Sequence, residues 1–121
     1  LTDRPPTPER VKESPFLKVN PRFLEPNLSE NIKAVKGFQK LAKDYGLSTA
    51  GLAIAWLIAK DEHIIPIPGT RSTIHLKEMV KGTEKNLTQT DIDEIEKTLP
   101  VGWAHGDRYS DIQWIGPERY C

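Results

Sequence analysis

A short apolar run that leads straight into a glycine turn constrains the fold of this chain more than any other feature. Residues 63–72 are His-Ile-Ile-Pro-Ile-Pro-Gly-Thr-Arg-Ser. An apolar run without alternation predicts a strand near residues 63–67 that is buried on both faces, although Pro66 cannot donate to a ladder and counts against a central strand. Ser72 is a good N-cap and opens an amphipathic helix predicted over residues 73–81.

The turn brings together the groups that bind a phosphate. Backbone N–H groups at the start of the helix, the positive end of the helix dipole and the side chain of Arg71 are expected to meet there. Many strand-to-helix turns carry a glycine and an exposed arginine without a ligand, so the spacing alone favours a turn that binds nothing over a phosphate site. A second glycine at dinucleotide-fingerprint spacing and a Gly-Lys-Ser/Thr motif are both missing, so the sequence supports neither a Rossmann turn nor a P-loop.

The start of the chain differs from the part that follows it. Residues 1–28 contain six of the ten prolines and no sustained apolar periodicity, which predicts a loop or a disordered arm. Three prolines near the start would also suit a polyproline ligand, although a surface loop is favoured. From Ser29, a plausible N-cap, apolar residues recur at helical spacing as far as Gly46, the expected C′ residue.

Two further helices are predicted on either side of the glycine turn. Ser48 or Thr49 is expected to cap a helix over residues 50–60, and its apolar content runs almost all the way round. Such a helix needs cover on most sides. Thr88 and Asp91 form a start that resembles a capping box, with Asp in place of the usual Glu, for an acidic helix near the end of the chain.

Composition excludes several classes of function. Seventeen basic and seventeen acidic side chains cancel, so no bulk attraction to nucleic acid or to a membrane surface is expected. No apolar run approaches the ~20 residues of a membrane helix, and no signal peptide opens the chain. The single cysteine, Cys121, cannot form an internal disulfide, which fits a reducing, cytoplasmic compartment. Three scattered histidines predict no metal site: His63, His75 and His105.

A helix-turn-helix is an alternative interpretation of residues 38–59. Gly46 would lie in the turn, and Ser48 and Thr49 would begin the second helix. A recognition helix needs basic and amide side chains near its start to reach base edges. Residues 50–59 contain no Arg, Lys, Asn or Gln, so no nucleic-acid partner is expected.

Five segments of the chain occur in the order of one known family. Residues 65–71, Ile-Pro-Ile-Pro-Gly-Thr-Arg, resemble the last barrel strand and the following loop of the aldo-keto reductases. Residues 47–57 are similar to the helix before that strand. The resemblance covers nearly all of residues 20–110 without large gaps. The remaining three segments that carry it are residues 21–31, 86–88 and 106–109.

The resemblance implies an α/β fold, the C-terminal part of a (β/α)8 barrel. Such barrels take about 250 residues or more, so a chain of 121 residues is expected to be a partial sequence that follows the seventh strand. The family's catalytic Asp, Tyr, Lys and His lie in the first half of the barrel, and no catalytic residue is assigned here. The implied organisation is a loop over residues 1–28, helices and the last barrel strand over 29–99, and a tail over 100–121.

The tail is rich in aromatic residues. Aromatic side chains in an irregular segment usually dock onto a surface. In the family this tail lies near the mouth of the active site, which makes Trp103 and Trp114 candidates for substrate contact, although structural anchoring is favoured. The aromatic residues of the tail are Trp103, Tyr109, Trp114 and Tyr120.

The resemblance also implies a cofactor site after the eighth strand, where the 2′-phosphate and adenine of NADPH bind. Gly69 is expected to let the backbone approach the cofactor, and Thr70 to hydrogen-bond the phosphate. Arg71 is expected to pair with the 2′-phosphate through its guanidinium, which favours NADPH over NADH. Ser72 stands where many relatives carry a second basic residue, and it would contribute its hydroxyl.

The following helix adds three candidates to this site. His75 aligns with an Arg of some family branches and is a possible stacking or phosphate contact, or a surface histidine. Glu78 fits the family's adenine-contacting Glu. Met79 replaces the usual Asn and offers only apolar contact. Arg22 is a remote candidate for the pyrophosphate, with loop packing as the favoured role.

For the whole enzyme, the resemblance implies an oxidoreductase that uses NADP(H) to reduce an aldehyde or ketone to an alcohol. The partner is then a small-molecule carbonyl substrate, without nucleic acid or membrane, and the sequence gives no indication of an oligomeric state. A non-catalytic, nucleotide-binding regulatory or interaction module of the same fold is the alternative. Both interpretations use the same predicted cofactor residues.

Overall fold

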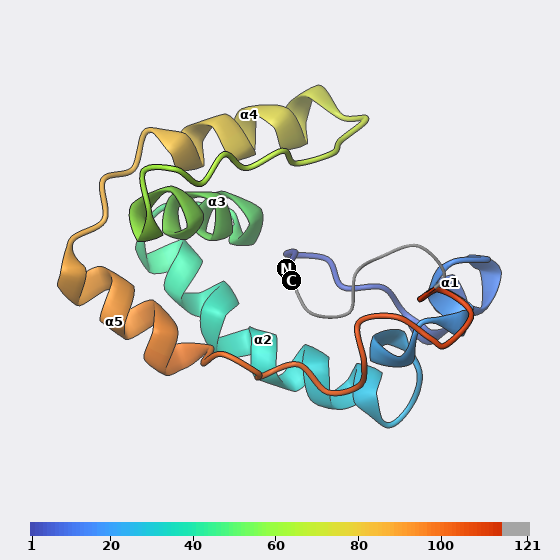
Figure 1. Cartoon of the computed structure of the whole chain (residues 1–121). Coiled ribbons are helices and arrows are strands. Elements are labelled where there is room, and N and C mark those ends of the chain that lie inside the picture. The colour runs from blue at the N-terminus through green and yellow to red at the C-terminus, as the bar shows by residue number, and fades with distance from the viewer. Residues whose placement is uncertain (115–121) are drawn as a thin grey trace. The chain divides into compact units, whose positions relative to one another are not determined.

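The computed structural model describes residues 1–114, and its regular elements are helices (Figure 1). No strand occurs in this part of the chain, and none of its helices combines the length and apolar content needed to cross a bilayer. In chain order the elements are α1 (Pro8–Glu13), the 3-10 turns η1 (Leu17–Val19) and η2 (Pro21–Phe23), α2 (Asn27–Asp44), α3 (Thr49–Lys60), α4 (Thr73–Thr83) and α5 (Gln89–Thr98).

The chain divides into two compact units. Unit 1 contains Leu1–Arg4 and Val35–Val101, and unit 2 contains Pro5–Ala34 and the described part of the tail, residues 102–114. Unit 1 therefore includes α3, α4, α5 and most of α2, together with the predicted cofactor residues. Unit 2 includes α1, both 3-10 turns and the described part of the tail.

The predicted helix ends are confirmed where the signal is a local hydrogen bond. Gly46 has a φ of 68° and ends α2. The amide of Leu47 donates to the carbonyl of Ala42 at 2.9 Å, and the amide of Gly46 donates to the carbonyl of Lys43 at 2.8 Å. These two bonds form a Schellman motif, which favours glycine at the left-handed position. Between the two predicted N-caps of α3, the structure uses Ser48, whose hydroxyl accepts from the amide of Gly51.

The predicted start of α2, with Ser29 as the N-cap, is wrong by three residues. The helix begins at Asn27, and the amide of Glu30 already donates to the carbonyl of Pro26. Ser29 instead directs both its amide and its hydroxyl to the carboxylate of Glu25, at 3.3 and 3.0 Å. The acidic side chain in the preceding turn therefore takes the capping role that the sequence suggested for a serine hydroxyl.

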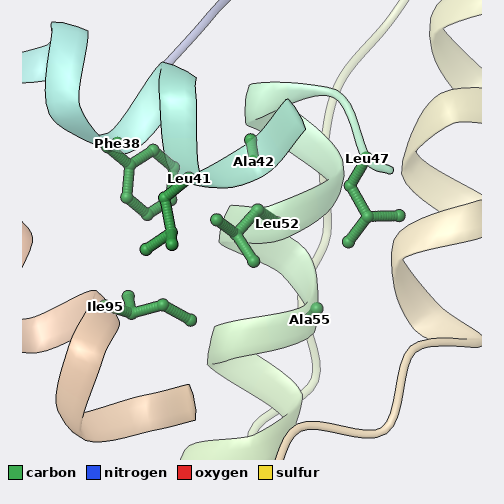
Figure 2. Close-up of a cluster of buried hydrophobic side chains, with 7 residues drawn as sticks. All are labelled: Phe38, Leu41, Ala42, Leu47, Leu52, Ala55 and Ile95. Atoms are coloured by element: carbon green, nitrogen blue, oxygen red, sulfur yellow. The ribbon is translucent and has the colours of Figure 1, made fainter. Parts of the chain in front are cut away.

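The core of unit 1 lies where α2, α3 and α5 meet. Figure 2 shows Leu52 of α3 among Phe38 and Leu41 of α2 and Ile95 of α5. Leu52 is fully buried, as the apolar character of α3 predicts for the face that packs against α2 and α5. The remaining members of this cluster are Ala42, Leu47 and Ala55.

Polar contacts between helices surround this core. The predicted capping box of α5 is confirmed, because Thr88 and Asp91 exchange side-chain and backbone hydrogen bonds. The hydroxyl of Tyr45 donates to the carboxylate of Asp91 at 2.6 Å. This bond, with those from Thr88, lowers the pKa of Asp91 from 3.8 to about 2. On the other side of α5, Glu96 accepts hydrogen bonds from the Trp56 indole and the Lys60 ammonium of α3.

Two glycines let the backbones of α3 and α4 touch. A Cβ placed on Gly82 of α4 would lie 2.2 Å from the carbonyl oxygen of Gly51 of α3. A Cβ on Gly51 would lie 2.9 Å from the carbonyl oxygen of Glu78. Both glycines are buried. The closeness of this helix pair therefore depends on the absence of side chains at these two positions.

The prediction that residues 1–28 form only a loop is wrong. Pro8–Glu13 form the helix α1, whose N-cap Thr7 accepts a hydrogen bond from the amide of Arg10. Pro8 takes the first helical position, and Glu9 lies in the first turn. Both residues favour a helix start, so the local signal was present within the proline-rich composition.

The predicted strand at residues 63–67 is not formed. Residues 64–70 have no regular structure and connect α3 to α4 (Figure 1). Ile65 is 82% exposed and Ile67 is 92% exposed, so burial on both faces is also wrong for this chain. A parallel strand requires hydrogen-bonding neighbours, and residues 1–114 contain no other strand to provide them.

Asparagine side chains attach the tail within unit 2. Asn20 is buried and donates to the carbonyl of Arg108 at 2.8 Å. The amide group of Asn31 both donates to and accepts from the backbone of His105, at 2.9 and 2.7 Å. Tyr109 and Trp114 pack edge to face with ring centroids 5.2 Å apart. These contacts support the anchoring role predicted for the tail, while Tyr120 and Cys121 lie outside the described residues.

Candidate functional site

A pocket of about 620 Å³ lies within unit 1, beside the glycine turn and α4. Its volume falls in the range of about 300–1,000 Å³ that is typical of small-molecule sites. Three parts of the chain line it besides Ala50 of α3. These are the N-terminal segment Thr2–Arg4, the turn residues Gly69 and Thr70, and the α4 residues Ile74, His75, Glu78 and Met79.

The glycine contact between α3 and α4 positions one side of the pocket. Ala50 precedes Gly51, and the carbonyl oxygen of Glu78 lies close above Gly51. Glu78 and Met79 therefore face the same region as Ala50, and all three line the pocket. Met79 is buried, with 8% of its surface exposed, so this side is apolar apart from the half-buried Glu78.

The turn before α4 is held by two hydroxyl groups. The amide of Ser72 donates to the hydroxyl oxygen of Thr70 at 3.1 Å. The hydroxyl of Ser72 accepts from the amide of His75 at 3.4 Å, which confirms Ser72 as the predicted N-cap of α4. The amides of Thr73 and Ile74 lie in the first turn, where a helix offers them no acceptor. They remain available to an anionic ligand.

Gly69 leaves open space in the pocket. A Cβ on this residue would meet no atom within 4 Å, and its φ is not positive. Neither protein crowding nor backbone conformation therefore requires glycine at this position. The free space above the backbone is what a closely approaching ligand would use.

The structure brings five of the seven predicted cofactor residues to one pocket. They are Gly69, Thr70, His75, Glu78 and Met79. Arg71 and Ser72 are not among its lining residues. Arg71 is exposed next to the lining residue Thr70, and it forms no ion pair within residues 1–114. Ser72 uses its hydroxyl as the helix cap.

Five lining residues were missed by the sequence interpretation: Ala50, Ile74 and, in the N-terminal segment, Thr2, Asp3 and Arg4. Arg4 is the only lysine or arginine in the lining, whereas Asp3 and Glu78 are its acidic residues. Nothing local in the sequence marks the N-terminal positions, because residues 2–4 reach the pocket only through contacts with α2 and α3. The basic residue that lines the pocket is therefore far in sequence from the arginine that the turn motif suggested.

Arg22, the remote candidate for a pyrophosphate contact, has a structural partner in unit 2. Its Nε donates to the carbonyl of Gly106 at 3.3 Å. Its backbone carbonyl accepts from the side-chain amide of Asn31 at 3.0 Å. These contacts support the loop-packing role that the sequence favoured.

Comparison with known proteins identifies the family. Residues 2–100 match the family model described as "Aldo/keto reductase family". The chain belongs to the aldo/keto reductase family, whose members are oxidoreductases. The family implies a TIM barrel. No solved structure matches the chain.

Three curated relatives show the same assignment. The chain is 34% identical over 101 residues to "Probable aldo-keto reductase 1" of Glycine max, covering 84% of this chain and 29% of that protein. It is 28% identical over 109 residues to "Aldo-keto reductase yakc [NADP(+)]" of Schizosaccharomyces pombe, covering 90% and 32%. It is 29% identical over 106 residues to "Aldo-keto reductase" of Gibberella moniliformis, covering 88% and 32%. The chain thus spans about a third of the length of these relatives.

Proposed function

We propose that this chain is the C-terminal part of an NADPH-dependent aldo-keto reductase and supplies the end of the cofactor site that binds the adenosine 2′-phosphate. The observation that carries the proposal is the gathering of five predicted cofactor residues around one pocket of about 620 Å³. The name of the Schizosaccharomyces pombe relative includes NADP(+), which supports the same cofactor here. When bound, this cofactor supplies the hydride that reduces an aldehyde or ketone.

The groups at the turn fit a phosphate. The amides of Thr73 and Ile74 and the positive end of the α4 dipole are directed toward the space before the helix. Thr70 offers a hydroxyl at the pocket. Arg71 follows Thr70 directly and is exposed, so its guanidinium is available for a bidentate contact with the 2′-phosphate.

The groups on α4 fit an adenine ring. Glu78 can accept a hydrogen bond from an exocyclic amine, because a carboxylate is an acceptor at neutral pH. Met79 and Ile74 offer apolar surface for the ring face. His75 adds an imidazole that can stack on the base or donate to a phosphate.

The exposed isoleucines support the proposal that this chain is one part of a larger barrel. Ile65 and Ile67 are among the most exposed apolar residues of the described chain. Leu76 and Val80 of α4 are half-exposed as well. Neighbouring barrel strands on either side of residues 64–67 would cover these isoleucines and complete the pairing that the segment lacks.

The test is a calorimetric titration of the chain and of Arg71→Ala with NADPH and NADH. If Arg71 pairs with the 2′-phosphate, the substitution weakens NADPH binding about tenfold, the size of one charge-assisted contact, and leaves NADH binding within about twofold. Arg10→Ala, at an exposed arginine of α1, is the matched control and should change neither affinity. An equal loss for both cofactors would contradict the role of Arg71, and no NADPH binding by the unmodified chain would contradict the proposed site.

A further inference from the structure

The N-terminal segment is fastened to the rest of unit 1 by the side chain of Asp3. The amide of Thr49 donates to both carboxylate oxygens of Asp3, at 3.3 and 3.2 Å. The hydroxyl of Thr49 donates to the same carboxylate. Thr49 is fully buried, whereas Asp3 is exposed, so a rigid residue of the helix holds a residue of an otherwise irregular segment.

This contact is distinct from the cap of α3. Ser48 is the N-cap, and its hydroxyl accepts from the amide of Gly51 at 3.0 Å. Asp3 takes the amide of Thr49, a first-turn donor that has no acceptor inside the helix. A carboxylate at the start of a helix is also favoured by the dipole. The helix is therefore capped without Asp3, and the separate consequence of the Asp3 contact is to hold the segment.

The residues beside Asp3 are those that line the pocket. Thr2 and Arg4 both line it, together with Asp3 itself. A second anchor comes from α2, because the amide group of Gln39 donates to the carbonyl of Thr2 at 2.8 Å. Arg4 itself has no ion-pair partner within residues 1–114. The position of its guanidinium therefore depends on how the backbone of residues 2–4 is held.

We propose that Asp3 is a positioning residue for nucleotide binding: through Thr49 it holds residues 2–4 as one side of the pocket and places Arg4 there. The inference rests on the proposed function, since the ligand is the same NADPH. Asp3 does not contact the ligand in this role. It acts through the backbone that it ties to α3.

The direction in which a charge-removing substitution changes the affinity for NADPH distinguishes the positioning role from a direct electrostatic effect. Asp3→Ala removes a negative charge from a pocket that binds a polyanion, so electrostatics alone would tighten NADPH binding. Loss of the hydrogen bonds from Thr49 leaves the contact between Gln39 and Thr2 as the remaining anchor of the segment, and the positioning role therefore predicts weaker binding. We expect about a tenfold increase in the dissociation constant, the effect of one lost hydrogen-bond contact to a carboxylate.

Two conservative variants and one control complete the experiment. Asp3→Asn keeps an acceptor oxygen for Thr49 and should retain most of the affinity. Thr49→Ser keeps both donors and should bind like the unmodified chain, whereas Thr49→Val loses the hydroxyl and should bind more weakly. Asp44→Ala removes an exposed carboxylate at the end of α2 and is the control. Thermal midpoints measured on the same samples separate positioning from global unfolding.

The possible outcomes distinguish this inference from the proposed function. If Asp3→Ala weakens NADPH binding, keeps its thermal midpoint, and is substantially rescued by Asp3→Asn, Asp3 has the positioning role. If the unmodified chain binds NADPH and Asp3→Ala binds as well as Asp44→Ala or more tightly, the inference is wrong and the proposed site stands. If the unmodified chain does not bind NADPH, the proposed function fails first, and the inference fails with it.

Discussion

The close contact of α3 and α4 predicts that Gly82→Ala is destabilising although alanine is the better helix former. The added Cβ would lie 2.2 Å from the carbonyl oxygen of Gly51 and 2.8 Å from its carbonyl carbon and Cα. Ordinary van der Waals contact begins near 3.4 Å, so the first of these distances is 1.2 Å too short. The opposing atoms belong to the backbone of α3. A rotamer change therefore cannot relieve the clash, and the helices have to separate.

The expected magnitude follows from two opposing effects. Overpacking a well-packed contact costs about 1–3 kcal/mol, and a clash with backbone atoms belongs near the upper limit. The higher helix propensity of alanine stabilises the folded chain by about 1 kcal/mol. The net loss is about 2 kcal/mol of unfolding free energy, or roughly a thirtyfold change in the ratio of folded to unfolded chain. Separation of the helices would also move Ala50 away from Met79 at the pocket, and under the proposed function this change would weaken NADPH binding.

Urea unfolding followed by circular dichroism measures the effect, with Gly37→Ala as the control. Gly37 lies in the middle of α2, and its added Cβ would meet only the side-chain methyl group of Thr98, at 3.1 Å. That methyl group can move, so the higher propensity of alanine should leave Gly37→Ala neutral or up to about 1 kcal/mol more stable. If Gly82→Ala is as stable as Gly37→Ala, α3 and α4 do not touch through their backbones in solution.

Two further predictions concern α5 and the tail. The pKa of Asp91 is lowered from 3.8 to about 2 by the hydrogen bonds from Tyr45 and Thr88, so its contribution to stability is present above pH 3.8 and is lost as the pH falls toward 2. Asp91→Asn should therefore reduce the change of the urea midpoint between pH 5 and pH 2, roughly the range of the two pKa values. An unchanged pH dependence of the midpoint would refute this assignment. Gly106 has a φ of +82°, and a Cβ on it would lie 2.6 Å from the side-chain nitrogen of Asn27. Gly106→Ala should cost about 1–3 kcal/mol locally and speed amide exchange of His105 in unit 2, whereas an unchanged exchange rate would refute the strained tail turn.

The helix ends were predictable because their signals are local. Gly46, Ser48, Ser72 and the Thr88–Asp91 pair each act on atoms within five residues. Hydrogen bonds of this range form in the same way whatever lies further along the chain. The missed helix α1 carried a local signal too, since Thr7 and Pro8 form a cap and a first helical position, but the proline content of the surrounding residues outweighed it.

The predicted strand was wrong for a different reason. An apolar run indicates that a segment has to be buried, but the residues that bury it belong to other segments. Residues 64–67 are apolar enough to need burial, but residues 1–114 contain no strand that could pair with them. Ile65 and Ile67 are exposed as a result. Whether a strand forms at residues 64–67 therefore depends on segments that could pair with it, and the pattern of the segment alone does not decide it.

The candidate site likewise has one part that a local sequence pattern marks and one part that depends on residues far apart in the chain. Its proposed phosphate end consists of the Thr70 and Ser72 hydroxyls and the first turn of α4, which lie within a few residues of one another, so a local sequence pattern marks these positions. The side formed by residues 2–4 depends on Thr49 and Gln39, which lie more than 30 positions away, and no local pattern marks it. Because Asp3, Arg4 and Glu78 all belong to this pocket, its charge cannot be judged from the turn motif alone. If the proposed function holds, we expect affinity for an anionic nucleotide to depend on the contact between Asp3 and Thr49 as well as on Arg71.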